Sequence, residues 1–146
     1  MRYGRVSGQG QKDDLDTQVE RLQVWAKAER PGRKTLVLSD IGSGVSATRK
    51  HLLRLLKMVC EDRVGEVAVT YGDRLTRFGQ EYLETLFDSF GVTLTILSPG
   101  EEQTPEQELT ADLLAMISSF SGRLYGMRSH KQKELLKCAQ AVINNP

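Results

Sequence analysis

Short runs of β-branched and other apolar residues alternate along the first hundred residues with longer segments in which apolar residues recur every three or four positions. The short runs predict strands at residues 2–6, 35–38, 66–71 and 92–97. The longer segments predict helices over 13–29, from Ser46 to Cys60 and from Phe78 to Phe90. Strands that alternate with helices form parallel sheets, so we expect an α/β fold with a mostly parallel sheet of four to five strands flanked by helices.

The predicted helices carry recognisable end signals. Pro31-Gly32 ends the first helix, Ser46 is placed to cap the second, and Gly91 closes the third. The apolar stripe of the second helix is expected at Leu52, Leu53, Leu56, Val59 and Cys60.

The last third of the chain has a different pattern. Thr104, Pro105 and Gln107 form an N-cap, a first-turn proline and a capping-box glutamine, and no stop signal follows before Asn144. One continuous helix of that extent would be roughly 60 Å long, too long to bury its apolar stripe on its own domain. The chain is therefore expected to divide into an α/β catalytic core, 1–102, and a long helix, 103–143, through which copies form a homodimer or homotetramer.

Charge and composition narrow the function classes. The 146 residues hold 20 Lys and Arg against 19 Asp and Glu, a net charge of +1 that excludes a protein wrapping nucleic acid by bulk charge. The apolar runs are too short for a signal peptide or a membrane span, so the cytoplasm is the expected location. Cys60 and Cys138 are 78 positions apart and fit neither a zinc site nor a disulfide framework.

Polar residues gather where the predicted strands end. Ser7 follows the first strand, Asp40 and Ser43 the second, and Asp73, Arg74 and Arg77 the third, while Arg49 opens the next helix and Arg5 precedes Ser7. The carboxyl ends of parallel strands share one edge of the sheet, where ligands bind. Guanidinium groups match the charge that builds on a phosphodiester under attack by a hydroxyl, and they need no metal. We therefore expect phosphoryl transfer at this edge, without cofactor or metal.

Each residue also has a structural interpretation. Ser7 alone is typical of a loop serine that caps a backbone group, and Asp73 with Arg77 of a surface helix pair. Acidic residues at 13, 14 and 16 fit the dipole of a helix start better than a metal site. Gly8-Gln9-Gly10 lacks the spacing of a phosphate-binding glycine loop.

Taken together, three ordered motifs resemble the catalytic domain of the serine recombinases, a family of resolvases, invertases and some transposases. The resemblance covers residues 2 to about 130 and is closest to the serine transposases of insertion elements. The motifs are Tyr3-x-Arg5-Val6-Ser7 with Gln11, Asp14-Leu15 and Gln18; Asp40-x-x-Ser43-Gly44 with Arg49-x-x-Leu52; and Asp73-Arg74-Leu75-x-Arg77.

The resemblance implies DNA strand transfer through a covalent intermediate. Ser7 would attack DNA and form a 5′-phosphoserine link, releasing a 3′-hydroxyl. Asp73 would serve proton transfer or orient an arginine, and Gln18, Asp40 and Ser43 would support the site. The residues expected to bind and stabilise the scissile phosphate are Arg5, Arg49, Arg74 and Arg77.

The chain departs from the family pattern in places. Gly8 replaces a hydroxyl residue of many resolvases, and Gly122 a glutamate of their long helix. We find no helix-turn-helix pattern before Tyr3 or after Asn145, so a separate DNA-binding domain is expected to be absent from this chain. Binding to double-stranded DNA is accordingly expected to be weak, salt-sensitive and non-specific.

Two other function classes stay open at this point. The first is a non-catalytic dimerisation module of the same fold, which would have no use for four arginines around one serine. The second is a small-molecule phosphoryl-transfer enzyme, which would have no use for a long helix. A covalent adduct on nicked DNA that disappears in Ser7→Ala would separate the leading hypothesis from both.

Overall fold

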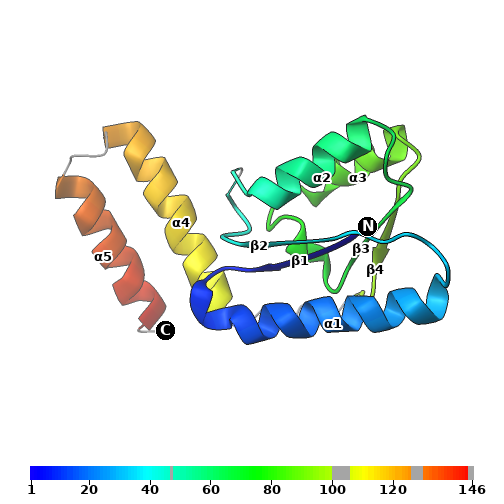
Figure 1. Cartoon of the computed structure of the whole chain (residues 1–146). Helices are drawn as coiled ribbons and strands as arrows, with labels where there is room; N and C mark the ends of the chain where they lie inside the picture. The colour runs from blue at the N-terminus through cyan, green and yellow to red at the C-terminus, as the bar shows by residue number, and fades with distance from the viewer. Residues whose placement is uncertain (47, 100–105, 126–129, 145–146) are drawn as a thin grey trace. The chain divides into compact units, whose positions relative to one another are not determined.

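The computed structural model describes residues 1–46, 48–99, 106–125 and 130–144 (Figure 1). Backbone contacts divide the chain into two compact units, Met1–Gln103 and Thr104–Pro146. The first unit is an α/β domain and the second is built from helices. Among the described helices, none combines the length and apolar character that a bilayer crossing requires.

The first unit alternates strands and helices as the apolar pattern predicts. Two short 3₁₀ helices, η1 (Gln9–Gln11) and η2 (Gly72–Arg74), follow β1 and β3. The other elements are β1 (Arg2–Val6), α1 (Lys12–Glu29), β2 (Val37–Ile41), α2 (Lys50–Cys60), β3 (Glu66–Val69), α3 (Gln80–Ser89) and β4 (Thr93–Ile96).

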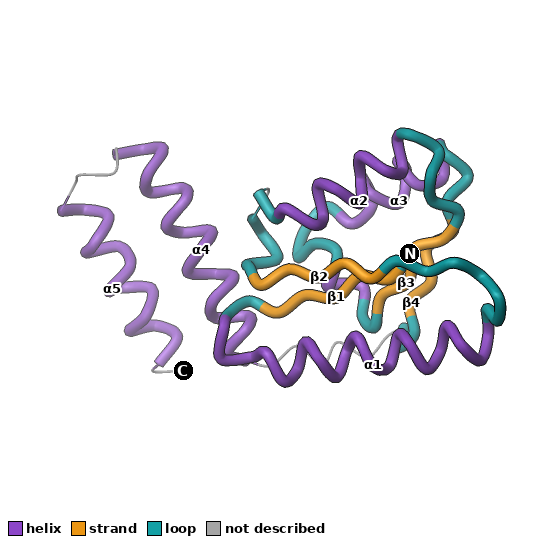
Figure 2. The backbone as a smooth tube through the Cα atoms, viewed as in Figure 1, coloured by secondary structure: helices purple, strands orange, loops and turns teal. Residues whose placement is uncertain are grey.

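The four strands form one parallel sheet in the order β2-β1-β3-β4, which confirms the expected fold class (Figure 2). In the register of β1 and β2, Arg5 lies opposite Asp40. Because all strands run the same way, the segments after β1, β2 and β3 meet at one edge.

Helices cover both faces of the sheet: α1 lies on one side, α2 and α3 on the other (Figure 1). The hydrophobic core lies between the sheet and the pair α2 and α3, because their apolar stripes face the strands. It contains Tyr3, Leu38, Leu52, Leu55, Val59, Val67, Val69, Leu75, Phe87 and Val92.

Gly4 lets α1 approach β1 closely. A Cβ atom at this position would lie 3.2 Å from Leu15 Cδ1 and 3.5 Å from Gln18 Oε1. The missing side chain therefore gives Gln18 access to the backbone of β1, a contact that the site below depends on.

The start of α2 differs from the prediction. The helix begins at Lys50, and Ser46 does not cap it; Ser46 Oγ instead accepts a hydrogen bond from Thr48 N at 3.3 Å. Within α2, Leu52 and Val59 are buried as expected, but Leu53 and Cys60 are exposed and Leu55 is buried instead. Strand β2 also begins and ends later than predicted, so that Asp40 lies inside it.

The second unit corrects the prediction of one continuous helix. A C-terminal helix is present, but it consists of α4 (Glu106–Tyr125) and a separate helix α5 (His130–Asn144), which packs against α4 (Figure 2). Tyr125 ends α4 directly before Gly126 in the sequence, and Gly122 lies in its last turn. Glycine costs about 1 kcal/mol relative to alanine in a helix interior, which favours a helix end here.

Candidate active site

Three segments at the carboxyl edge of the sheet are held together by the side chain of Arg5, which is fully buried. Its Nη1 donates to Ser7 Oγ and to the Gly42 carbonyl, both at 3.1 Å. Its Nη2 donates to the Asp73 carbonyl at 2.9 Å and its Nε to the Arg74 carbonyl at 3.3 Å. One guanidinium therefore joins the segments after β1, β2 and β3 and fixes Ser7 among them.

Two glutamines fix the backbone around Ser7. Gln18 Oε1 accepts from Arg5 N at 3.1 Å and its Nε2 donates to the Arg5 carbonyl at 3.0 Å, as a neighbouring strand would. Gln11 Oε1 accepts from the amides of both Ser7 and Gly8 at 3.2 Å. Helix α1 and η1 thus position the serine from one side, while Arg5 positions it from the other.

The Asp73 carboxylate pairs with two arginines. Arg74 donates to it from Nε and Nη2 at 3.0 and 2.8 Å, and Arg77 donates from Nη1 at 3.0 Å. Arg74 also donates from Nη1 to the Arg5 carbonyl at 2.7 Å. These three side chains are nearly buried, so their interactions are less screened than those of a surface pair.

Arg49 joins the same cluster from the N-cap position of α2. Its Nη1 lies 3.4 Å from the Arg74 carbonyl, which Arg5 also contacts, and its Nη2 donates to the Leu75 carbonyl. Nη1 donates in addition to the Tyr3 hydroxyl at 3.1 Å. We call Arg5, Arg49, Arg74 and Arg77 the arginine cluster.

Asp40 lies in a second polar group beside the arginine cluster. Its Oδ2 accepts from the Tyr3 hydroxyl and from Leu52 N, both at 2.8 Å. Its Oδ1 lies 3.1 Å from His51 N and from His51 Nδ1. Asp40 therefore caps the amino end of α2 from β2, which is the role the sequence assigned to Ser46.

Two groups of this network have shifted pKa values. Burial alone would raise the pKa of Asp40, but hydrogen bonds from His51, Tyr3 and Leu52 outweigh it and lower the pKa. Burial raises the pKa of the Tyr3 hydroxyl, so Tyr3 stays neutral and donates to Asp40. Tyr3 thereby connects the Asp40 carboxylate to Arg49.

The structure brings together most of the site residues named from the sequence. Ser7, Arg5, Asp73, Arg74 and Arg77 form one hydrogen-bonded group, to which Arg49 and Gln18 attach. Ser43 lies in the segment after β2, where its Oγ accepts from Val45 N at 3.2 Å. The pair of Asp73 and Arg77 is not the surface helix pair of the alternative interpretation.

Two residues named in the motifs, Tyr3 and Gln11, were given no role, and Gly42, an unspecified position of the second motif, supplies a backbone carbonyl to Arg5. His51, expected as an exposed helix residue, is only partly exposed and contacts Asp40. The separation of these residues along the sequence from Ser7 and Asp40 does not predict these contacts. The contacts depend on where α1 and α2 pack on the sheet.

Charge and geometry together suit an anionic ligand. Four guanidiniums lie together in the arginine cluster, with the Asp73 carboxylate on Arg74 and Arg77 and the Asp40 carboxylate linked to Arg49 through Tyr3. A serine hydroxyl lies directly against it. A phosphodiester is the class of substrate that gains charge on attack by such a hydroxyl.

Comparison with known proteins gives one consistent family. The family model described as the resolvase N-terminal domain matches residues 1–142. The catalytic domain of ISC1926 TnpA, an IS607-like serine recombinase, superimposes with a TM-score of 0.82 at 43% identity over 99% of this chain and 97% of that one. A serine recombinase from Sulfolobus solfataricus superimposes with a TM-score of 0.78 at 40% identity, covering 99% of this chain and 96% of that one.

Curated relatives agree but are longer. A protein of Acanthamoeba polyphaga mimivirus named as a resolvase is 37% identical over 132 residues, which are 90% of this chain and 66% of that protein. A Mycobacterium bovis protein without an assigned function is 31% identical over 86% of this chain and 40% of its own length. The chain thus spans about two thirds or less of these relatives. It belongs to the serine recombinases, within the resolvase N-terminal-domain family, and it has the fold of their catalytic domains.

Proposed function

We propose that this domain transfers DNA strands by attack of Ser7 on a backbone phosphate. The observation that carries the proposal is the pair of hydrogen bonds by which one guanidinium, that of Arg5, contacts both Ser7 Oγ and the carbonyl of Asp73. The nucleophile and the arginine cluster therefore belong to one rigid group. Such positioning lowers the entropic cost of bringing serine and phosphate together.

The proposed step exchanges one ester bond for another. Ser7 Oγ forms a bond to phosphorus, the bond from phosphorus to O3′ breaks, and a 5′-phosphoserine and a free 3′-hydroxyl result. The serine proton leaves to an acceptor, for which Asp73 is our candidate, and O3′ takes up a proton as it departs. Attack of a 3′-hydroxyl on the phosphoserine reverses the step and needs no nucleotide, because the ester bond is retained.

We assign the four arginines two different tasks. Arg5 and Arg49 hold backbone carbonyls, so their task is to fix Ser7 and the segment after β3. Arg74 and Arg77 hold a carboxylate, which a phosphate resembles in charge and geometry. In our proposal the phosphate takes over donors of Arg74 and Arg77, and Asp73 is thereby freed to accept a proton.

Three polar residues support this arrangement. Gln18 holds the backbone of Arg5, Asp40 holds α2 and with it Arg49, and Ser43 orders the turn after β2 by accepting from Val45 N. We propose that none of them contacts the reacting phosphorus. Their substitution would reduce the reaction by moving Arg5, Arg49 or the turn.

A nicked duplex tests the proposal, because the nick lets one strand diffuse away and traps the covalent intermediate. The protein is incubated with this DNA and the adduct is counted on a denaturing gel. We expect an adduct with the native protein and with Ser89→Ala, an exposed serine of α3, but none with Ser7→Ala. An adduct that persists in Ser7→Ala overturns the proposal.

The alternative functions predict different results. A dimerisation module of the same fold gives no adduct with any DNA but still self-associates. A small-molecule phosphoryl-transfer enzyme releases phosphate from a nucleotide and gives no adduct with DNA. Because the site holds a serine within an arginine cluster, we favour strand transfer on DNA.

We accordingly expect the protein to act in the cytoplasm, where it would meet its substrate.

We also propose that the second unit carries self-association to a dimer or tetramer. Leu109, Leu113, Met116 and Phe120 recur every three or four residues along α4 and are exposed, although α5 packs against the same helix. Sedimentation of the native protein is expected to give a dimer or larger, and Met116→Glu/Phe120→Glu a monomer. A monomeric native protein would overturn this part.

Weak and sequence-indifferent DNA binding completes the proposal. Contacts through arginine reach the phosphates and carry no base information, so affinity is expected to fall steeply with salt. Titration with two unrelated duplexes of equal length should give the same dissociation constant at each salt concentration. Tight binding to only one of them would contradict the proposal.

A further inference from the structure

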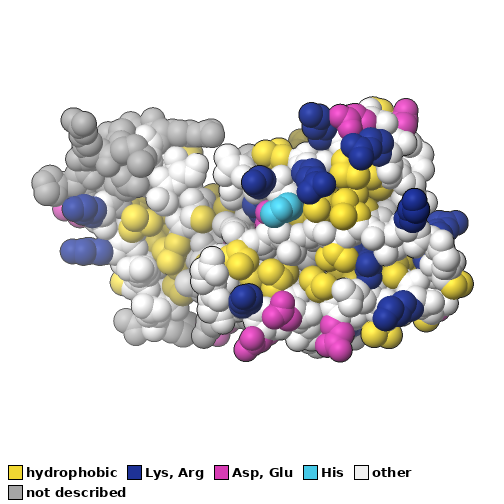
Figure 3. Space-filling model, in the orientation of Figure 1, with side chains coloured by type: hydrophobic (Ala, Val, Ile, Leu, Met, Phe, Trp, Pro, Cys, Tyr) yellow, Lys and Arg dark blue, Asp and Glu magenta, His cyan; other side chains and the backbone are white. Residues whose placement is uncertain are grey.

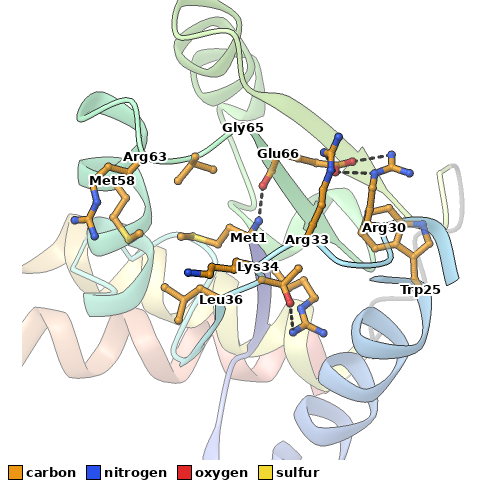
Figure 4. Close-up of a pocket in the computed structure, with 13 residues that line it drawn as sticks. Met1, Trp25, Arg30, Arg33, Lys34, Leu36, Met58, Arg63, Gly65 and Glu66 are labelled. Atoms are coloured by element: carbon orange, nitrogen blue, oxygen red, sulfur yellow. Dashed lines mark hydrogen bonds and ion pairs between the residues drawn. The ribbon is translucent and has the colours of Figure 1, made fainter. Parts of the chain in front are cut away.

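A basic hollow lies at the end of the sheet where the strands begin, opposite the end that holds Ser7 (Figure 4). It has a volume of about 200 Å³ and is lined by residues at the start of β1 and β3, by the end of α1 and by the segments before β2 and β3. A second hollow adjoins it and shares Arg2, Arg30, Arg33 and Thr35. None of these residues takes part in the active site.

Arg2 is the buried centre of both hollows. Its side chain is only 9% exposed and donates from Nη2 to Thr35 Oγ1 at 2.9 Å. Within the described part of the chain, its buried Nε has no hydrogen-bond acceptor. A buried donor without an acceptor costs about 1–3 kcal/mol, so Arg2 holds its positive charge beneath the hollows with one donor unmatched.

The described lining is strongly cationic. Six cationic side chains line the two hollows against one carboxylate, that of Glu66. Arg30 holds Glu66 through two hydrogen bonds of 3.0 and 3.1 Å, and Arg33 Nη1 lies 3.9 Å from the same carboxylate. Arg33 and Arg63 are 69% and 61% exposed, and Arg63 lies 3.3 Å from Glu61 outside the hollow. The other three cationic residues of the lining are Arg2, Lys27 and Lys34. Positive charge in the two hollows therefore exceeds negative charge even after the pairs with Glu66 and Glu61 are counted.

The charge of a helix end does not account for this arrangement. Cations near the last turn of α1 offset the helix dipole, which explains Lys27 and Arg30. Arg33 and Lys34 lie beyond that turn, and Arg63 follows α2 on another face of the sheet. Dark-blue side chains gather at this end of the first unit in the space-filling view (Figure 3).

We propose that the two hollows bind phosphate groups of a DNA backbone, as a second DNA contact of the first unit remote from Ser7. The proposal rests on the proposed function, because it takes the ligand to be DNA. Cations spread over two adjoining hollows suit the repeated phosphates of a strand better than one small anion. The buried Arg2 guanidinium supplies fixed positive charge beneath the hollows, and the exposed Arg33 and Lys34 supply mobile donors.

The chain contains an intrinsic fluorophore beside this site. Trp25 is its single tryptophan and lines the first hollow, with the guanidinium carbon of Arg30 5.2 Å from the ring centroid. A phosphate that binds Arg30 changes the charge next to the indole ring. Trp25 fluorescence should therefore respond to ligand at this site, and no inserted label is needed.

The test compares three proteins on a short duplex: native, Arg33→Gln/Lys34→Gln and Arg54→Gln/Lys57→Gln. The last removes the same charge from the exposed face of α2, outside both hollows. We expect DNA to change Trp25 fluorescence in the native protein and the α2 variant but much less in Arg33→Gln/Lys34→Gln. Each phosphate contact contributes about 0.9 to the slope of log affinity against log salt concentration. Between about 50 and 200 mM salt, the fall in DNA affinity should therefore be about tenfold smaller for Arg33→Gln/Lys34→Gln than for the native protein.

Other results would overturn the proposal. One is an Arg33→Gln/Lys34→Gln protein with native fluorescence response and salt slope. Another is a response to pyrophosphate but none to DNA, which would make the hollow a site for a small free anion. Ser7→Ala should keep the fluorescence response to DNA. If the native protein forms no adduct on nicked DNA but its fluorescence still responds to DNA, strand transfer is contradicted and the second DNA contact is still supported.

Discussion

The guanidinium of Arg5 donates a hydrogen bond of 3.1 Å to the hydroxyl oxygen of Ser7. In the proposed reaction, a positive donor at this oxygen stabilises the serine as it loses its proton and attacks the phosphate. Three carbonyls from the segments after β2 and β3 hold the same guanidinium, so it cannot leave the serine without breaking them. Arg5 thus links the proposed nucleophile, Ser7, to the segments at the carboxyl edge of the sheet.

Arg5→Lys keeps the positive charge but loses the planar fork that reaches four acceptors. We expect it to lower the free energy of unfolding by about 2–4 kcal/mol, because buried carbonyls lose their donors. Adduct formation on nicked DNA should be lost even where the variant is fully folded. Urea unfolding and the gel assay measure the two effects separately, and a fully active Arg5→Lys would show that charge alone suffices.

Gln18→Leu removes both hydrogen bonds to the backbone of Arg5 while filling a similar volume. The Arg5 amide then loses this acceptor, whereas the Arg5 carbonyl keeps Arg74 Nη1, so we expect a loss of about 1–3 kcal/mol in the free energy of unfolding. Gln23→Ala, on the exposed face of the same helix, should change it by less than about 0.5 kcal/mol. Equal losses in both variants would show that Gln18 is not special.

Asp73→Asn preserves the shape of the side chain but removes the charge that holds Arg74 and Arg77. If Asp73 accepts the serine proton, adduct formation should slow by about 100-fold or more. Asp88→Asn, on exposed α3, is the matched control and should react at the native rate. A native rate in Asp73→Asn would remove this residue from the proposed proton transfer.

Acid should destabilise the fold through Asp40. Its pKa is lower in the folded protein than in the unfolded chain, so its contribution is complete above the unfolded pKa of about 3.9 and is lost as the pH falls further. Urea unfolding should therefore show a steep loss of stability below about pH 4. Asp40→Asn should be less stable than native at neutral pH, and the gap should narrow in acid; a constant gap would contradict this assignment.

Gly79 has a φ of +74° at the N-cap of α3, two residues after Arg77. A side chain in this left-handed conformation costs about 1–2 kcal/mol, and a Cβ here would lie 3.0 Å from Tyr82 Cδ2. Gly79→Ala should lower the melting temperature, whereas Gly10→Ala, with open space around the added methyl group, should change it little. Calorimetry of the two variants measures the difference.

The strand and helix order of the first unit was predictable, because period-two and period-3.6 apolar patterns are local in the sequence. The stripe of α2 was not: in a run such as HLLRLLKMVC several leucines compete for the same face, and packing on the sheet buries Leu55 in place of Leu53. The predicted start of α2 was wrong for a related reason. Ser46 has the local signal of a cap, but Asp40 on a neighbouring strand supplies it.

The second unit also shows that a local sequence pattern does not predict tertiary packing. Its apolar repeat predicts helix, yet the repeat does not record where a helix ends, and Gly122 and Gly126 are compatible with a bend or a close backbone crossing. The structure has two helices that pack on each other.

The sequence by itself determined the class of fold and which residue types stand after each strand, because both follow from local patterns and from the direction of parallel strands. Only the tertiary structure decided the contacts: Arg5 on Ser7, Gln18 on the backbone of Arg5, and Asp40 on α2. The Gln18 and Asp40 hydrogen bonds depend on how closely a helix packs on the sheet, whereas carbonyls from the segments after β2 and β3 hold Arg5 on Ser7. Their geometry is set by packing at Gly4 and in the core, which no local pattern encodes.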